Sequence, residues 1–346
     1  MRVLENDALR VEIDSATGNI TRLLDKARNR ESLSPNAGAL LLMADAPAEW
    51  QAWNIDNLQG KRDWVDQAIR VDSVVRTPVG TSLTVHRERD SIRVAERYTL
   101  RDAPARLDIS LSIDWRGRER LLKLVVPLAF RVDSTRAEIP YASIARPTHP
   151  VTRRDSARFE TPMQRWLDAS ARGFGVAVVN DGKYGYSASG DTLFITLLRS
   201  SKFPDPHADI GLQRVELSIV PHAGDWRAPQ IRETAEELNS PLVAVAVSPH
   251  AGGADAGSWL TIEPSSVELG ALKRAEDDDR AIVRLVETSG RAAVAHLHFA
   301  RAVNATETDL LERELPHGVR ASGRTLDVPL SAFEIKTISV RPLQHH

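Results

Sequence analysis

The chain has 346 residues, a length that favours about two domains, and 42% of its residues are hydrophobic, as in a globular protein. Its net charge of −2, with basic residues interleaved among acidic ones, argues against nucleic-acid or membrane-surface partners. The absence of cysteine excludes disulfides and thiolate chemistry. With no long apolar run and no signal-peptide pattern at the start, we expect no membrane span and a cytoplasmic location.

Apolar and polar residues alternate from the first residues onward. Leu9, Val11 and Ile13 are separated by charged residues, which predicts a strand with one buried face. Residues 67–115 continue this two-residue period, most regularly at 107–115, with turn residues between the segments. No helical period occurs in this part of the chain, so it predicts a large antiparallel β domain.

Residues 48–57 combine aromatic and polar side chains. After an apolar run at 39–43, Trp50 and Trp53 flank a polar patch of Gln51, Asn54 and Asp56. Such a set can form a sugar-binding surface, because aromatic rings stack on C–H faces while amides and carboxylates bind hydroxyls. The alternative is that both rings pack into the core or against another domain.

Three prolines interrupt the strand pattern over residues 139–158. A connection of this length inside a compact domain is usually functional or mobile. His149 and the pair Arg153 and Arg154 lie in it. The alternative is that these are ordinary solvated side chains, after which strands resume at 159–168 and 175–179.

Residues 180–213 contain two turns, a strand and an acidic loop. Tyr184 and Tyr186 are two residues apart, which places both rings on one face if the segment is a strand. An apolar strand follows at 193–197, and the loop after it contains two prolines and carries Asp205 and Asp209. This loop could position groups for a ligand, or it could be an ordinary surface connection.

The domain boundary is predicted after the one clear helix. Residues 223–241 contain that helix, with Pro229 near its first turn. Residues 242–247 predict a further strand, and 248–257 a Gly-rich linker. We therefore expect a large β domain at 1–247 and a small β-sandwich at 258–346. His296 and His298 share one strand face there, but a third metal ligand is not evident.

Common catalytic motifs do not occur. The chain has no P-loop, dinucleotide-binding glycine motif, nucleophile elbow or zinc-protease helix. A glycosidase needs two facing carboxyl groups about 5 to 9.5 Å apart, which sequence does not establish for any pair here. The residues alone therefore favour a two-domain β protein with a carbohydrate-facing surface, in a binding or supporting role.

Several stretches, in order along nearly the whole chain, resemble one family. They include LENDALRVEID at 4–14, WQAWNID at 50–56, VNDGKYGY at 179–186, LFITLLRSSKFPDPHADIG at 193–211 and LNSPL at 238–242. Together they resemble the C-terminal half of a glycoside hydrolase family 38 α-mannosidase of the bacterial and cytosolic subgroup. The resemblance implies an all-β fold, with a large antiparallel supersandwich like that of aldose mutarotases followed by a small β-sandwich.

The resemblance also implies where the chemistry lies. In this family the nucleophile, the acid/base aspartate and the zinc ligands belong to an N-terminal barrel-like domain that a helical bundle follows. We expect this chain to start after that bundle, so it carries over no catalytic residue and no metal ligand. The implied parent is a retaining exo-α-mannosidase that acts on mannose-containing oligosaccharides, with zinc bound in the missing catalytic domain.

The role left for this chain is to support that domain and to form one wall of its cleft. By position, the cleft-side candidates are Trp50, Trp53, Asn54, Asp56, Asp205 and Asp209. Asn54 departs from the aspartate that the subgroup pattern has there. We expect the chain alone to be inactive and to self-associate through an apolar face. The alternatives are a stand-alone carbohydrate-binding module and a mutarotase-like epimerase with His149 or His207 as the acid.

Overall fold

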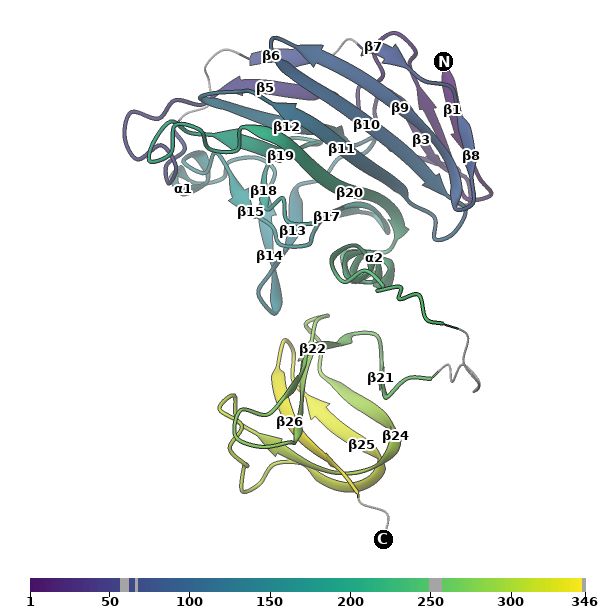
Figure 1. The fold of residues 1–346 in the computed structure, drawn as a ribbon, viewed down its shortest axis with the longest axis vertical. Coiled ribbons are helices and arrows are strands. Elements are labelled where there is room, and N and C mark those ends of the chain that lie inside the picture. The colour runs from purple at the N-terminus through teal and green to yellow at the C-terminus, as the bar shows by residue number, and fades with distance from the viewer. Residues whose placement is uncertain (57–61, 66–67, 249–256, 344–346) are drawn as a thin grey trace. The chain divides into compact units, whose positions relative to one another are not determined.

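The computed structural model describes residues 1–56, 62–65, 68–248 and 257–343 (Figure 1). The chain divides into two compact units. The large unit comprises Met1–Ile139 and Ile144–Leu242, and the small unit comprises Val243–His346 together with Pro140–Ser143. Both consist of antiparallel strands, which confirms the predicted all-β class. Residues 249–256 of the predicted linker lie outside the described residues.

The large unit contains three antiparallel sheets. A four-stranded sheet has the order β1-β2-β3-β4 and consists of β1 (Arg2–Glu5), β2 (Leu9–Ile13), β3 (Ile20–Asp25) and β4 (Arg30–Leu33). A six-stranded sheet has the order β15-β18-β19-β12-β5-β6 and consists of β5 (Leu40–Ala44), β6 (Arg62–Val65), β12 (Arg120–Pro127), β15 (Thr161–Pro162), β18 (Gly185–Ser189) and β19 (Thr192–Ser200).

The third sheet is the largest. Its order is β14-β13-β16-β17-β20-β11-β10-β9-β7, with β8 paired to β9. Its strands are β7 (Ala68–Val71), β8 (Val75–Thr77), β9 (Gly80–Arg89), β10 (Ile92–Arg101), β11 (Leu107–Trp115), β13 (Ser134–Ile139), β14 (Ala142–Pro147), β16 (Trp166–Ala171), β17 (Phe174–Asn180) and β20 (Gly211–Ala223). One apolar cluster joins all three sheets, with members such as Val11, Ile109 and Ile195 fully buried. This shared core makes the three sheets one unit.

The described residues contain two helices, where the sequence predicted one. The predicted helix is α2 (Pro229–Asn239), with Pro229 at its start and Ile231 and Ala235 buried against the sheet. The second is the single turn α1 (Arg153–Ser156), which Thr152 caps through a reciprocal bond with Asp155. No helix in the described ranges is long and apolar enough to cross a membrane.

Three local predictions for residues 1–247 were wrong. The segment 139–158, expected to be irregular, contains β14 and α1. Tyr184 is 49% exposed and Tyr186 only 1%, because β18 begins between them at Gly185 and the two rings therefore do not share a strand face. Residues 242–247 form no strand although their side chains are apolar, and Leu242 and Val243 are almost fully exposed.

The small unit is one sheet that folds over itself. Its order is β21-β24-β26-β23-β22, with β25 paired to β24. The strands are β21 (Leu260–Glu263), β22 (Val267–Arg274), β23 (Ala281–Glu287), β24 (Ala293–Thr308), β25 (Arg320–Leu330) and β26 (Ile335–Pro342). The long strand β24 pairs with β21 through residues 296–299 and with β26 through residues 303–308. Its two halves thus enclose an apolar core that includes Leu297 and Val340.

Candidate functional site

Two loops that lie about 150 residues apart in sequence meet beside the six-stranded sheet. One follows β5 and spans residues 45–56, and the other runs from the end of β19 through residues 199–209. We call them the 45–56 loop and the 199–209 loop. The backbone N–H of Lys202 donates to Oε1 of Gln51 at 2.9 Å, and the Trp53 and Phe203 ring centroids are 6.3 Å apart. The structure therefore joins the two segments singled out from sequence.

Arg199 fixes the position of the 45–56 loop. Its Nη2 donates to Oδ1 of Asp45 at 3.2 Å, and Nε donates to the other carboxylate oxygen, so the pair is bidentate. The same guanidinium donates to the backbone carbonyls of Ala52 and Asn54. Because Asp45 is only 2% exposed, this charge-assisted pair is shielded from solvent and holds the loop against β19.

Three aromatic rings are exposed on these loops. Trp50, Trp53 and Phe203 have 63%, 68% and 52% of their surface accessible. Trp50 and Trp53 meet edge to face, with centroids 6.2 Å apart and planes at 72°. The rings therefore form an exposed cluster of separate faces rather than one flat surface. Neither tryptophan is packed into the core of the large unit, which excludes one part of the alternative and leaves a contact with another domain as a prediction.

The polar candidates bond mainly within their own loops. Asp56 accepts from Nδ2 of Asn54 at 2.9 Å and from the backbone N–H of Ala48 at 3.1 Å, so both its oxygens are used. Asp205 accepts from the backbone N–H of His207 at 2.8 Å. Asp209 occupies the left-handed region with φ of 60°, a conformation that Asp tolerates in turns. These contacts shape the loops, and a facing pair of carboxylates is not established.

A second ionic link between the loops was missed from sequence. Glu119, just before β12, accepts from Nε2 of Gln51 at 3.2 Å and pairs with Nζ of Lys202 at 2.5 Å. The Lys202 ammonium, together with Gln51, holds the pKa of Glu119 below its usual value. Gln51 lies within the polar patch noted above, but nothing local in the sequence points to Glu119 as its partner.

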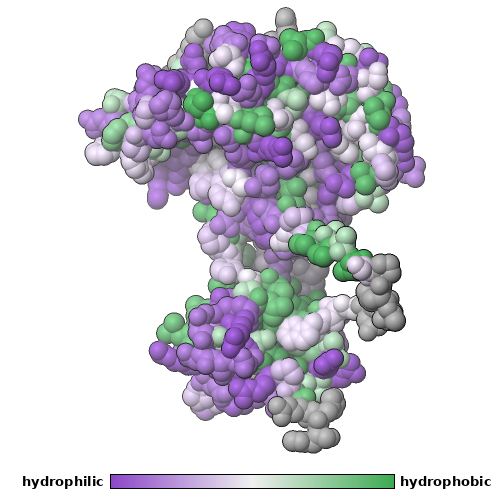
Figure 2. Space-filling model, viewed as in Figure 1, coloured by the Kyte–Doolittle hydropathy of each residue, from purple (hydrophilic) through white to green (hydrophobic). Residues whose placement is uncertain are grey.

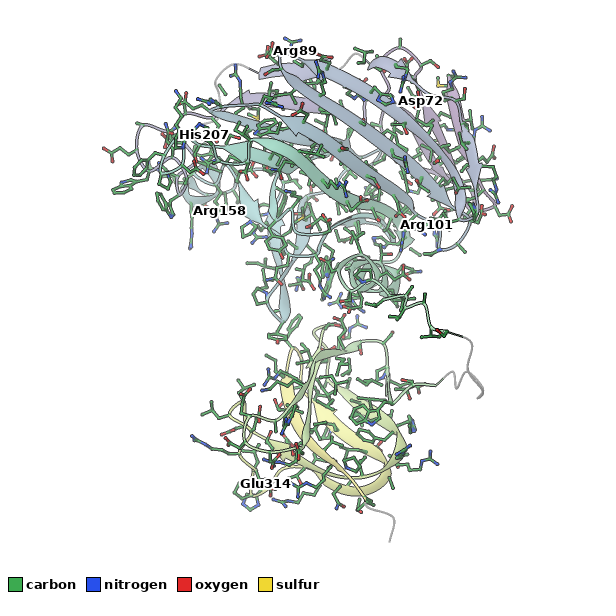
Figure 3. The ribbon with its side chains drawn as sticks, viewed as in Figure 1. Asp72, Arg89, Arg101, Arg158, His207 and Glu314 are labelled. Carbon is green, nitrogen blue, oxygen red and sulfur yellow. The ribbon has the colours of Figure 1, made fainter. Side chains whose placement is uncertain are left out.

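The histidines considered from sequence lie in different places. His207 projects from the exposed 199–209 loop (Figure 3), whereas His149 follows β14. His296 pairs with Asp327 at 2.8 Å and, like His298, faces solvent on β24. Among the described residues no group of three or more His, Asp or Glu could hold a metal ion, so the residues present here do not fit a zinc site.

Comparison with known families agrees with this architecture. Residues 4–207 match the glycosyl hydrolases family 38 C-terminal domain, and residues 266–338 match the family 38 C-terminal beta sandwich domain. The first match alone covers more than half of the chain. The chain therefore belongs to glycosyl hydrolase family 38 and corresponds to its C-terminal domains.

Individual relatives place the chain more closely within this family. It is 31% identical over 350 residues to Alpha-mannosidase 2C1 of Homo sapiens, a match that covers 97% of the chain and 33% of the relative. It is 28% identical to Alpha-mannosidase of Saccharomyces cerevisiae, covering 99% of the chain and 34% of the relative. The chain thus spans about a third of the length of the curated relatives it matches.

A solved structure shows the same fold. The alpha-mannosidase from Enterococcus faecalis V583 superposes with a TM-score of 0.83 at 18% identity, over 98% of this chain and 42% of that one. At 18% identity, this similarity shows the fold alone. It supports the arrangement of a large supersandwich and a small β-sandwich on one chain.

Proposed function

We propose that this chain forms the C-terminal β portion of a retaining, zinc-dependent exo-α-mannosidase that removes terminal mannose from oligosaccharides. The observation that carries the proposal is the match of 97% of the chain to one third of a curated α-mannosidase. We propose the cytoplasm as its location, since a chain without cysteine suits a reducing compartment. The proposed partner that completes the enzyme is a catalytic region, which lies in the part of the longer relatives that this chain does not match.

Within that enzyme, the 45–56 and 199–209 loops are proposed to form one wall of the substrate cleft. The exposed rings of Trp50, Trp53 and Phe203 can stack on the C–H faces of sugar rings. The Arg199–Asp45 pair and the Glu119–Lys202 pair hold the two loops together, so the wall is fixed before a sugar binds.

Bond cleavage is assigned to the catalytic region. Hydrolysis of a glycoside needs an acid and a nucleophile facing each other across the bond. In this chain the carboxylate of Asp56 is engaged by its own loop, and no described cluster fits zinc. No step of the reaction is therefore routed through residues of this chain.

The test is a turnover assay with an aryl α-mannoside. The purified chain is expected to release no product above a blank, with or without added zinc. As a positive arm, a chimaera in which this chain replaces the matching third of the human relative is expected to hydrolyse the substrate, and Trp53→Ala in the chimaera should raise KM more than it lowers kcat. Turnover by the chain alone would overturn the supporting role.

The exposure of Trp50, Trp53 and Phe203 also favours a second candidate, a stand-alone carbohydrate-binding module. Calorimetric titration of the chain with mannose separates the two. Millimolar binding that is lost in Trp53→Ala would support the module. Absence of heat from the chain, with activity in the chimaera, would support the cleft wall.

Self-association of the chain is proposed as well. Residues 242–247 expose apolar side chains, including Leu242 at 101% and Val243 at 87%, and no strand of the described chain pairs with them (Figure 2). An unpaired apolar segment is a template for pairing with another chain. Sedimentation velocity should show concentration-dependent association that Val243→Lys with Val245→Lys reduces. A monomer at all concentrations would contradict it.

A further inference from the structure

A small cavity lies at the edge of the large unit, and no residue of the 45–56 or 199–209 loop lines it. Its walls come from β13, β14, β18 and the connection that contains α1. β14 is the edge strand of the largest sheet and β15 the edge strand of the six-stranded sheet, so the cavity opens where both sheets end. Its volume is about 80 Å³, the space of about three waters.

Two buried hydroxyl groups form its floor. Tyr186 and Thr135 are 1% and 2% exposed, and their hydroxyl oxygens are 3.2 Å apart. Nη1 of Arg146 donates to the Tyr186 hydroxyl at 3.2 Å, and the guanidinium carbon is 5.8 Å from the centre of the tyrosine ring. The guanidinium is thus fixed against the floor by a side chain that is itself rigidly buried.

Arg146 has no counter-ion in the described part of the chain. A guanidinium carries five N–H donors, and the structure gives those of Arg146 a single acceptor, the neutral Tyr186 hydroxyl. Two other half-buried arginines of this unit do face a carboxylate, Arg199 with Asp45 and Arg165 with Glu138. Partial burial of a cation without an anion is unfavourable, so this position favours an added negative group.

The cavity lining also contains a serine hydroxyl that can donate. Ser187 accepts at Oγ from Nζ of Lys123 at 2.7 Å, which leaves its O–H to donate. His149 and Arg158 lie at the exposed rim, and Figure 3 labels Arg158. The one carboxylate of the lining, Asp155, accepts from the N–H and hydroxyl of Thr152 and from Arg158 at 3.2 Å. Its charge is therefore already balanced locally.

We propose that this cavity binds a small oxyanion, a carboxylate or a phosphate group, through the guanidinium of Arg146 with added bonds from Tyr186 and Ser187. An acceptor-only ligand matches the N–H groups of Arg146 and the O–H of Ser187, and a planar guanidinium binds two oxygens of such a group at once. The cavity volume suits a group of a few atoms and is too small for a hexose ring. This proposal does not depend on mannosidase activity.

The test is calorimetric titration of the whole chain with inorganic phosphate, with malonate and with mannose, at an ionic strength held constant with KCl. We expect phosphate or malonate to bind, and the two arms tell the phosphate and carboxylate classes apart. Arg146→Gln should raise Kd at least tenfold. Tyr186→Phe and Ser187→Ala should each raise Kd about two- to tenfold while the circular dichroism spectrum stays unchanged.

Arg154→Gln is the matched control, because Arg154 is an exposed arginine on α1 that does not line the cavity. It should leave Kd unchanged. Equal loss of binding in Arg154→Gln would indicate general surface charge and overturn the proposal. So would binding of mannose in an Arg146-dependent manner, or no binding of either anion at millimolar concentrations. If Arg146→Gln does not fold, the Kd values of Tyr186→Phe and Ser187→Ala test the proposal in its place.

Discussion

The large and small units satisfy their buried charges in different ways. In the large unit, Arg87 and Glu96 form an ion pair whose side chains are both 0% exposed, and Arg87 also donates to Oδ1 of Asn19 at 2.9 Å. In the small unit, the fully buried carboxylate of Glu287 accepts from backbone N–H groups of the following turn and of Phe333. In the large unit the side chain of Arg87 links β9 to β10 and to the turn before β3, whereas in the small unit backbone donors bind one carboxylate at a turn. We therefore expect the loss of each arrangement to cost a different amount of stability.

The largest effect is expected from breaking the buried pair. Arg87→Met leaves the Glu96 carboxylate buried beside the Tyr98 hydroxyl without its cation, which should lower the free energy of unfolding by about 3 to 5 kcal/mol. Urea denaturation followed by circular dichroism measures this loss.

Arg93→Met is the control, because Arg93 pairs with Glu88 at the surface of the same hairpin and should cost no more than about 1 kcal/mol. Arg87→Met combined with Glu96→Leu should recover much of the lost stability, since no charge is then left buried. Equal losses in Arg87→Met and Arg93→Met would mean that the buried pair is not what distinguishes the large unit.

A smaller effect is expected from Glu287→Gln in the small unit, about 1 to 3 kcal/mol at neutral pH. Burial alone would raise the pKa of Glu287, but the bonds from Phe333, Ser289 and Gly290 outweigh it and lower the pKa. The stabilisation is therefore present above the ordinary glutamate pKa and is lost as the pH falls through the lowered value. Thermal unfolding across acidic pH should show the variant and the wild type converging.

Glu314→Gln is the matched control in that unit, since Glu314 lies at the surface and pairs with Arg320 at 3.2 Å (Figure 3). It should change stability by no more than about 0.5 kcal/mol and leave the acid dependence intact. A difference between Glu287→Gln and wild type that stays constant down to acidic pH would contradict the role of the carboxylate.

The smallest effect is expected at Glu216 of β20, where the pKa is shifted in the opposite direction to that of Glu287. Burial, with the nearby charges of Asp181 and Asp108, raises the pKa of Glu216. Because the pKa of Glu216 is higher in the folded protein than in the unfolded chain, protonated Glu216 stabilises the fold. This stabilisation is fully present below the ordinary glutamate pKa and is lost as the pH rises through the raised value. Glu216→Gln should therefore stabilise the protein at neutral pH by up to roughly 0.5 kcal/mol. Destabilisation at neutral pH, measured by urea, would contradict the assigned sign.

Local pattern was sufficient for most of the fold. The alternation at 107–115 coincides with β11 (Leu107–Trp115), and Pro229 stands at the start of α2 as its fixed φ predicts. Local pattern failed at 242–247, because strand propensity describes side chains and does not supply a partner strand. It failed at Tyr184 because the turn beginning at Asn180 delays the start of β18 by one residue.

Less of the candidate site than of the fold could be predicted from the sequence. Trp50 and Trp53 are recognisable by composition, but their contact with Phe203 depends on β5 and β19 flanking β12 in one sheet. That long-range pairing also brings Arg199 to Asp45, and neither residue stands out locally. The shape of the site is thus set by sheet order, which no short segment contains.

The exposed segment after α2 also has a practical consequence. An extended backbone with small aliphatic side chains is the preferred substrate of elastase-like proteases, which bind a chain as an added strand. Residues 242–247 expose leucine, valine and alanine side chains at the point along the chain where the large unit ends and the small unit begins. Brief digestion should therefore cut first within this segment and release two stable fragments, each with its own core. One cleavage would then allow the large and small units to be studied separately.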